Sequence, residues 1–175
     1  YLRPQIDDKE ISLTLDAPDS VPAIGDRDQV TEVFQNLIEN AIKYSPPKSN
    51  VQVRLEPGQT RDQAERPVPI LGAGASRLTL AAPKSGSAER YVTLRVQDHG
   101  RGIERRDLPR LAERFYRVGG QKSGPNEGTG LGLAIVKHVV NRHRGGFTVE
   151  SVPGGGSVFS AFFPAPAGSA RRDEL

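Results

Sequence analysis

The chain has 175 residues, a length typical of one globular domain, with 24 Lys and Arg against 21 Asp and Glu. The net charge of +3 is spread thinly, which argues against a nucleic-acid partner, because such proteins concentrate their positive charge. The absence of Cys excludes disulfides, thiolate metal sites and cysteine nucleophiles. The absence of Met leads us to expect a piece of a longer protein.

The first part of the chain predicts strand, strand and helix. Residues 11–15 (ISLTL) alternate apolar and polar side chains, as a half-buried strand does, and residues 21–25 (VPAIG) predict a short second strand. From 30 to 42 apolar residues recur every three or four positions, with acidic residues before them and a Pro pair after them. This spacing predicts an amphipathic helix.

The middle of the chain predicts two strands around an insertion. VQVRL at 51–55 and YVTLRVQD at 91–98 read as strands. Residues 57–90 between them are rich in Gly, Pro, Ala and Ser, so we expect a loop with a mobile tip and a short strand, RLTLAA, that widens the sheet. A contact of this insertion with a partner is the open alternative.

Past residue 98 the pattern predicts a short helix near 108–114, a flexible loop at 118–130, a helix from 131 to 140, and strands at 147–152 and 157–163. Three glycines between the last two strands favour a hairpin. Residues 165–175 are expected to be disordered.

DHGRG, at 98–102, places a carboxylate directly after an apolar strand. Gly100 and Gly102 allow a ligand to approach the backbone beside Asp98. A simple turn is the alternative explanation, because turns also combine Asp with Gly.

GTGLG, at 128–132, opens the second predicted helix. Free amide groups at a helix start favour an anion, and glycines let a phosphate come close to them. The pattern is neither a Walker loop nor a dinucleotide fingerprint, and plain helix capping remains the alternative.

Polar residues gather on one face of the first helix, namely Asn36, Asn40, Lys43 and Tyr44. The Asn40 carbonyl oxygen suits Mg²⁺, and Lys43 supplies a charge for phosphate. A solvated polar flank is the alternative for this helix taken alone.

Five segments taken together resemble the nucleotide-binding boxes of sensor histidine kinases of the GHKL superfamily, and most closely those of phosphate-regulon sensor kinases. They are NLIENAIKYS (36–45), DHGRGI (98–103), ERFYRV (113–118), GTGLGLAIVKHVV (128–140) and GGGSVFSAFFP (154–164). The resemblance covers nearly the whole chain apart from 57–90 and the tail. It implies a Bergerat-type α/β two-layer sandwich, with a mixed, mostly antiparallel sheet and helices on one face. Residues 1–164 would form this ATP-binding domain, with 117–127 as a flexible lid.

The resemblance also implies roles for individual residues around bound ATP and Mg²⁺. At the base, Asp98 would accept the adenine amino group. Tyr44, Gly100, Gly102 and Ile103 would shape this pocket, and Ser157 would reach the base through water. Asn40 would hold Mg²⁺, supported by Asn36. On the phosphate side the residues would be Lys43, Lys122, Gly128, Thr129, Gly130, Leu131 and Gly132, with Phe115 at the base of the lid.

The family transfers the ATP γ-phosphate to a histidine on a dimerisation domain, and no histidine of this chain lies in such a segment. We therefore expect that phosphoacceptor domain N-terminal to this chain, a cognate response regulator as partner, a membrane-anchored homodimeric parent, and a mainly monomeric, cytoplasmic fragment. Two alternatives stay open: a regulatory module that binds nucleotide without transfer, and another GHKL-type ATPase. Against the latter, Asn36 stands where ATP-hydrolysing relatives such as gyrase carry a Glu.

Overall fold

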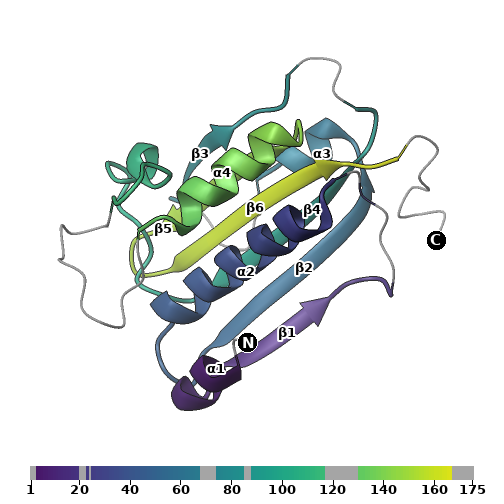
Figure 1. Cartoon of the computed structure of the whole chain (residues 1–175). Helices are drawn as coiled ribbons and strands as arrows, with labels where there is room; N and C mark the ends of the chain where they lie inside the picture. The colour runs from purple at the N-terminus through teal and green to yellow at the C-terminus, as the bar shows by residue number, and fades with distance from the viewer. Residues whose placement is uncertain are drawn as a thin grey trace.

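A six-stranded sheet in the order β1-β2-β4-β6-β5-β3 organises the computed structural model, which describes residues 3–19, 23, 25–67, 74–84, 88–116 and 130–166. In chain order the elements are α1 (Arg3–Lys9), β1 (Ser12–Asp16), α2 (Arg27–Tyr44), β2 (Asn50–Gln59), α3 (Arg61–Glu65), β3 (Ser76–Ala81), β4 (Tyr91–Asp98), the 3₁₀ turn η2 (Leu108–Arg110), α4 (Gly132–Arg142), β5 (Gly146–Val152) and β6 (Gly156–Pro164). Figure 1 shows α2 and α4 lying across the same face of the sheet.

The strand pairing is mixed and mostly antiparallel, as the resemblance implied. Only β1 and β2 run parallel, and the other neighbours are antiparallel. Because side chains alternate along a strand, the register sends Leu94, Val96 and Phe159 to the face that α2 and α4 cover. The main hydrophobic core therefore lies between the sheet and these two helices.

The helix α2 begins and ends where its sequence predicts. The Asp26 side chain accepts a hydrogen bond from the Gln29 amide at 3.0 Å, which caps the first turn. The helix ends at Tyr44, before the Pro pair, and its apolar stripe is buried at Val33, Leu37, Ala41 and Ile42. Burial of each of the Val, Leu and Ile side chains contributes roughly 1.5–3 kcal/mol, so packing rather than propensity holds the helix in place.

Most of the remaining predicted elements are confirmed. The RLTLAA segment forms β3, which pairs with β5 at the sheet edge, and β2 continues past the predicted 51–55 to Gln59. The short helix predicted near 108–114 is wrong in extent, because only Leu108–Arg110 is helical and with 3₁₀ geometry. Most of the strand predicted at 21–25, the 117–127 lid and the tail beyond 166 fall outside the described residues.

Two short helices were not predicted, and α3 changes how the 57–90 insertion is understood. Thr60 and Gln63 form a capping box at its start. Ala64 is fully buried against Tyr91 and Phe162, whose rings meet edge to face at 5.3 Å between centroids. These side chains point away from α2 and α4, so α3 covers part of the second face of the sheet.

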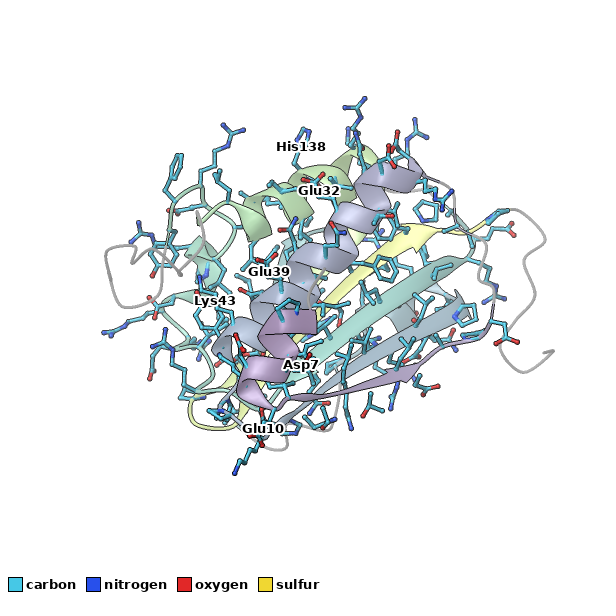
Figure 2. All side chains as sticks on the ribbon, turned by 60° about the horizontal axis from the view of Figure 1, so that its bottom comes forward. Asp7, Glu10, Glu32, Glu39, Lys43 and His138 are labelled. Atoms are coloured by element: carbon cyan, nitrogen blue, oxygen red, sulfur yellow. The ribbon has the colours of Figure 1, made fainter. Side chains whose placement is uncertain are left out.

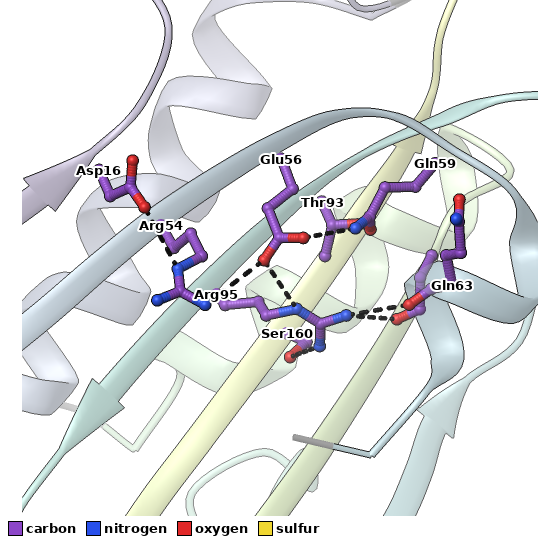
Figure 3. Close-up of polar contacts among 9 residues, drawn as sticks. Asp16, Arg54, Glu56, Gln59, Gln63, Thr93, Arg95 and Ser160 are labelled. Carbon is purple, nitrogen blue, oxygen red and sulfur yellow. Dashed lines mark hydrogen bonds and ion pairs between the residues drawn. The ribbon is translucent and has the colours of Figure 1, made fainter. Parts of the chain in front are cut away.

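A buried arginine joins α3 to that second face (Figure 3). Arg95 is only 8% exposed, and its guanidinium donates to the Ser160 hydroxyl at 2.9 Å and to the Gln63 and Ala64 carbonyls at 3.1 and 3.3 Å. Its Nε lies 3.7 Å from a Glu56 carboxylate oxygen. The first part of the insertion is thus built into the fold.

We expect Arg95→Met to lower the free energy of unfolding by about 2–4 kcal/mol, because it removes the donor that the buried α3 carbonyls share with Glu56. Arg54→Met is the matched control. Arg54 pairs with Asp16 at 3.5 Å, but its side chain is 43% exposed. The control should therefore cost under about 1 kcal/mol. Urea unfolding of the two variants measures both values, and equal losses would contradict the role given to Arg95.

Candidate functional site

A buried carboxylate marks one end of the central strand β4. Asp98 is 4% exposed and stands on the face that α2 and α4 cover. The Gly100 amide donates a hydrogen bond to its Oδ1 at 2.8 Å. Burial raises the pKa of Asp98 to about 6, an effect larger than the opposing one of this hydrogen bond. The strand end therefore presents a strong hydrogen-bond acceptor that little water solvates.

The last residue of α2 lies against the glycine turn that follows Asp98. A Cβ on Gly100 would stand 2.4 Å from the Tyr44 carbonyl oxygen, so only glycine permits this approach. The Tyr44 side chain is 41% exposed, and its ring has the Lys43 ammonium at 5.4 Å and the Arg101 guanidinium at 5.7 Å from its centroid. A partly exposed aromatic residue with two cations near its ring thus packs its backbone against the turn that follows the buried carboxylate.

The same turn packs against the hairpin between β5 and β6. Gly102 has φ +71°, and a Cβ there would lie 2.0 Å from the Val152 carbonyl oxygen. Both the conformation and the space require glycine. The Arg101 carbonyl accepts a hydrogen bond from the Gly154 amide at 2.7 Å, which fixes the contact between the two loops.

Ser151 links this turn to the final strand. Its hydroxyl accepts from the Ile103 amide at 2.8 Å, donates to the Gly156 carbonyl at 3.0 Å, and lies 2.8 Å from the Ser157 hydroxyl. Sequence reasoning missed Ser151 and Arg101. A signal for Ser151 was present, because a serine stands in β5 on the face where Phe147 and Val149 are core residues.

The start of α4 lies beside the middle of α2. A Cβ on Gly132 would be 3.2 Å from the Asn36 side-chain oxygen, so α4 begins directly beside that asparagine. The capping position, Leu131, makes no side-chain cap hydrogen bond. The first amides of an α-helix have no partner within the helix, and an anion can bind to them.

Phe115 is hydrogen-bonded to Gly130, shortly before the start of α4. Its amide donates to the Gly130 carbonyl at 3.0 Å, its φ is +66°, and its ring is 71% exposed. This hydrogen bond joins two described residues on either side of the predicted lid, and Phe115 is exposed there.

The described members of the predicted site lie on α2, at the end of β4, at the start of α4 and in β6. They are Asn36, Asn40, Lys43, Tyr44, Asp98, Gly100, Gly102, Ile103, Phe115, Gly130, Leu131, Gly132 and Ser157. Contacts connect Asn36 with Gly132, Tyr44 with Gly100, and Phe115 with Gly130. Figure 2 shows Lys43 on α2, one turn from Glu39. Lys122, Gly128 and Thr129 lie outside the described residues.

The arrangement fits an adenine nucleotide. A buried acceptor, an aromatic ring and close glycine backbones stand at one end, and helix amides stand at the other. Within the described ranges no three His, Cys, Asp or Glu side chains are grouped as metal ligands. No helix in that part of the chain is long and apolar enough to cross a membrane.

Comparison with known proteins also supports a nucleotide-binding site. A sequence model described as "Histidine kinase-, DNA gyrase B-, and HSP90-like ATPase" matches residues 25–167. The phosphate regulon sensor protein PhoR of Pseudomonas aeruginosa is 36% identical over 161 residues, 91% of this chain and 30% of that protein. The sensor-like histidine kinase SenX3 of Mycolicibacterium smegmatis is 35% identical over 158 residues, 90% of this chain and 33% of that protein.

Solved structures agree with the fold. The mycobacterial sensor histidine kinase MprB matches with a TM-score of 0.63 at 26% identity, over 94% of this chain and 90% of that chain. The catalytic domain of the histidine kinase ThkA matches with a TM-score of 0.65, over 94% and 85% of the two chains, and at 19% identity it supports the fold alone. The chain spans about a third of the length of the sequence relatives named above.

We expect Asp98→Asn to stabilise the ligand-free domain. The pKa of Asp98 rises from 3.8 to about 6 on folding, so the folded state binds more protons between these values. The resulting stability is complete below the lower value and is lost as the pH rises through the higher one. Asn stays neutral, so the variant should gain about 1–3 kcal/mol near pH 7 and almost nothing near pH 4. Urea unfolding across pH measures this difference, with the exposed Asp8→Asn as control. A gain that does not change with pH would contradict the explanation.

Proposed function

Because the chain belongs to the family of histidine kinase-, DNA gyrase B- and HSP90-like ATPases, we propose that its domain serves a sensor histidine kinase. It would bind ATP and pass the γ-phosphate to a histidine on a dimerisation domain elsewhere in the parent protein. The observation that carries the proposal is the buried Asp98 carboxylate beside Tyr44 and two close-packed glycines. Relatives named sensor kinases at 35–36% identity support it.

At the base, Asp98 would accept a hydrogen bond from the adenine amino group in a site that little water enters. Tyr44 would pack on the nucleoside, with Gly102 and Ile103 shaping the pocket. Ser157 would reach the base through water. Because the Gly100 amide and Ser151 already hold this end in place, little reorganisation is needed on binding.

On the phosphate side, the residues would position charge rather than form bonds. Asn40 would offer its side-chain oxygen to Mg²⁺, which when bound neutralises phosphate charge. Asn36 would support that site, and Lys43 would meet a phosphate. The amides near Gly128, Thr129, Gly130, Leu131 and Gly132 would hold the remaining oxygens, and Lys122 would reach the terminal phosphate when a lid at 117–127 closes over Phe115. Phosphoryl transfer depends mainly on such positioning.

Two of the three histidines, His99 and His143, have hydrogen-bond partners within the fold, which supports an acceptor located elsewhere. His143 accepts a hydrogen bond from the Asp26 amide at 2.9 Å, and its other ring nitrogen lies 2.8 Å from the Val139 carbonyl. The His99 Nδ1 lies 2.9 Å from the Asn50 carbonyl.

ATP hydrolysis by this domain lacks support as well, because among the described residues no glutamate stands where a base could activate water. Glu39 precedes Asn40 by one position, so its side chain points about 100° away from that of Asn40 around the helix.

The wider setting is proposed on the same grounds. Residues 1–164 would be the catalytic domain and 165–175 a disordered tail. The partners would be the parent's own dimerisation and phosphoacceptor domain and a response regulator. The parent would be a membrane-anchored homodimer with this domain, mainly monomeric by itself, on the cytoplasmic side.

Calorimetric titration with a non-hydrolysable ATP analogue tests the base end of the site. The chain should bind the adenine analogue selectively over its guanine counterpart. Asp98→Asn should weaken binding by about 1–3 kcal/mol through loss of a charge-assisted hydrogen bond. Asp8→Asn is the control and should bind as the unmodified chain does. Equal affinity for Asp98→Asn would remove the base-recognition assignment.

The magnesium assignment has its own test. Asn40→Ala should reduce the gain in nucleotide affinity that Mg²⁺ gives, by about tenfold if one ligand is lost. Affinity without Mg²⁺ should change little. Asn141→Ala, at an exposed position on α4, is the matched control. The same Mg²⁺ dependence in Asn40→Ala and in the control would exclude Asn40 as a ligand.

A further inference from the structure

A lysine outside the matched family region caps the helix that carries the nucleotide-site residues. Lys9 ends α1, and its ammonium donates to the carbonyls of Ile42, Lys43 and Ser45 at 3.1, 2.7 and 3.2 Å. An ammonium has three hydrogens, so these contacts can use all of them. Figure 2 shows α1, with Asp7 and Glu10, lying against the end of α2 near Lys43.

The last turn of a helix is where such a cation has most effect. The final four carbonyls of an α-helix have no partner within it, and the helix dipole makes that end negative. Lys9 meets both needs for α2 with one side chain from a different element. The Ser45 hydroxyl adds a bond to the Ala41 carbonyl at 2.6 Å. The end of α2 is therefore held from outside as well as by its own cap.

The backbone of Lys9 is fixed too. Its carbonyl accepts from the Lys48 amide at 2.9 Å, and the Ser12 amide donates to the Ser49 carbonyl at 3.0 Å. These bonds tie the junction of α1 and β1 to the loop that follows α2. Lys9 is thus held both at its backbone and at its side-chain ammonium group.

The residue between two of these carbonyls is Tyr44. Lys9 holds the carbonyls of Lys43 and Ser45, and the Tyr44 carbonyl lies against Gly100, whose amide bonds to Asp98. These contacts connect the Lys9 ammonium, through the last turn of α2 and Gly100, with the buried Asp98 carboxylate. Release of that turn would change the distance between the Tyr44 ring and Asp98.

We propose that Lys9 is a positioning residue of the nucleotide site, which sets the placement of Tyr44 relative to Asp98 by holding the last turn of α2. The inference rests on the proposed function, in which these two residues bind the adenosine part of ATP. Lys9 itself touches no nucleotide. Its effect on binding therefore passes through Tyr44.

The test is a double-mutant cycle on affinity for a non-hydrolysable ATP analogue. Lys9→Met should weaken binding about three- to tenfold, a part of what one charge-assisted hydrogen bond is worth. Tyr44→Ala should also weaken it. In the Tyr44→Ala background, Lys9→Met should change the affinity by less than about twofold, because residues that act through one another are not additive. Lys9→Arg, which keeps the charge and donors, should restore most of the affinity.

Two controls separate positioning from loss of charge or stability. Lys48→Met removes an exposed lysine from the adjoining loop and should leave affinity unchanged. Arg95→Met destabilises the domain from the other face of the sheet and should also leave affinity unchanged at a temperature where it is folded. If Lys9→Met does not fold, Lys9→Gln, which keeps two donors without the charge, takes its place in the cycle.

The possible outcomes distinguish failure of the role of Lys9 from failure of the proposed function. Weakening by Tyr44→Ala with unchanged affinity in Lys9→Met would overturn the role of Lys9 and leave the proposed function intact. Additive losses in the double variant would overturn it as well, because Lys9 would then act elsewhere. Unchanged affinity in Tyr44→Ala would remove the adenosine assignment itself, and the positioning role with it.

Discussion

The desolvation of one carboxylate is the constraint around which this domain is built. Asp98 stands at the end of a strand buried along its whole length, and its hydrogen bonds with the backbone of Gly100 and Ser157 offset only part of the effect of burial on its pKa. The glycines at 100 and 102 allow the backbone of Tyr44 and of Val152 to pack closely against the turn that follows this carboxylate. The ligand-free domain bears the free-energy cost of desolvating this carboxylate. A ligand that donates a hydrogen bond to it therefore gains binding free energy.

The helix α2 carries side chains of the proposed site, and contacts with other parts of the chain fix its position. At its start, the Asp26 amide bonds to His143 beyond the end of α4. In its middle, Asn36 stands beside the first residue of α4, and at its end Lys9 holds the last carbonyls. Three other parts of the chain thus fix one helix along its length. These contacts hold the polar residues of α2 in defined positions.

Much of the fold and of the site could be predicted from local pattern. The apolar stripe of α2 and the apolar residues at alternate positions of β4 and β6 were sufficient, because each of these three elements packs one face against the main core. The helix α1 could not be predicted in the same way, since its seven residues include one core contact, Ile6. The helix α3 had a readable signal, the capping box of Thr60 and Gln63, inside a segment whose composition favoured a loop. Arg95 was the hardest case, because strand alternation cannot tell an exposed polar face from one that another segment covers.

That covered second face has a consequence for how the sequence can change over time. Most strands of a two-layer domain have one side where substitutions are nearly neutral, because those side chains meet water. The strand β4 has no such side: all eight of its residues are buried, with α2 and α4 over one face and α3 near the other. A mutation anywhere in it is a core mutation. Evolutionary drift in this domain should therefore collect at β1, where every position is exposed, and spare the strand that ends in the site.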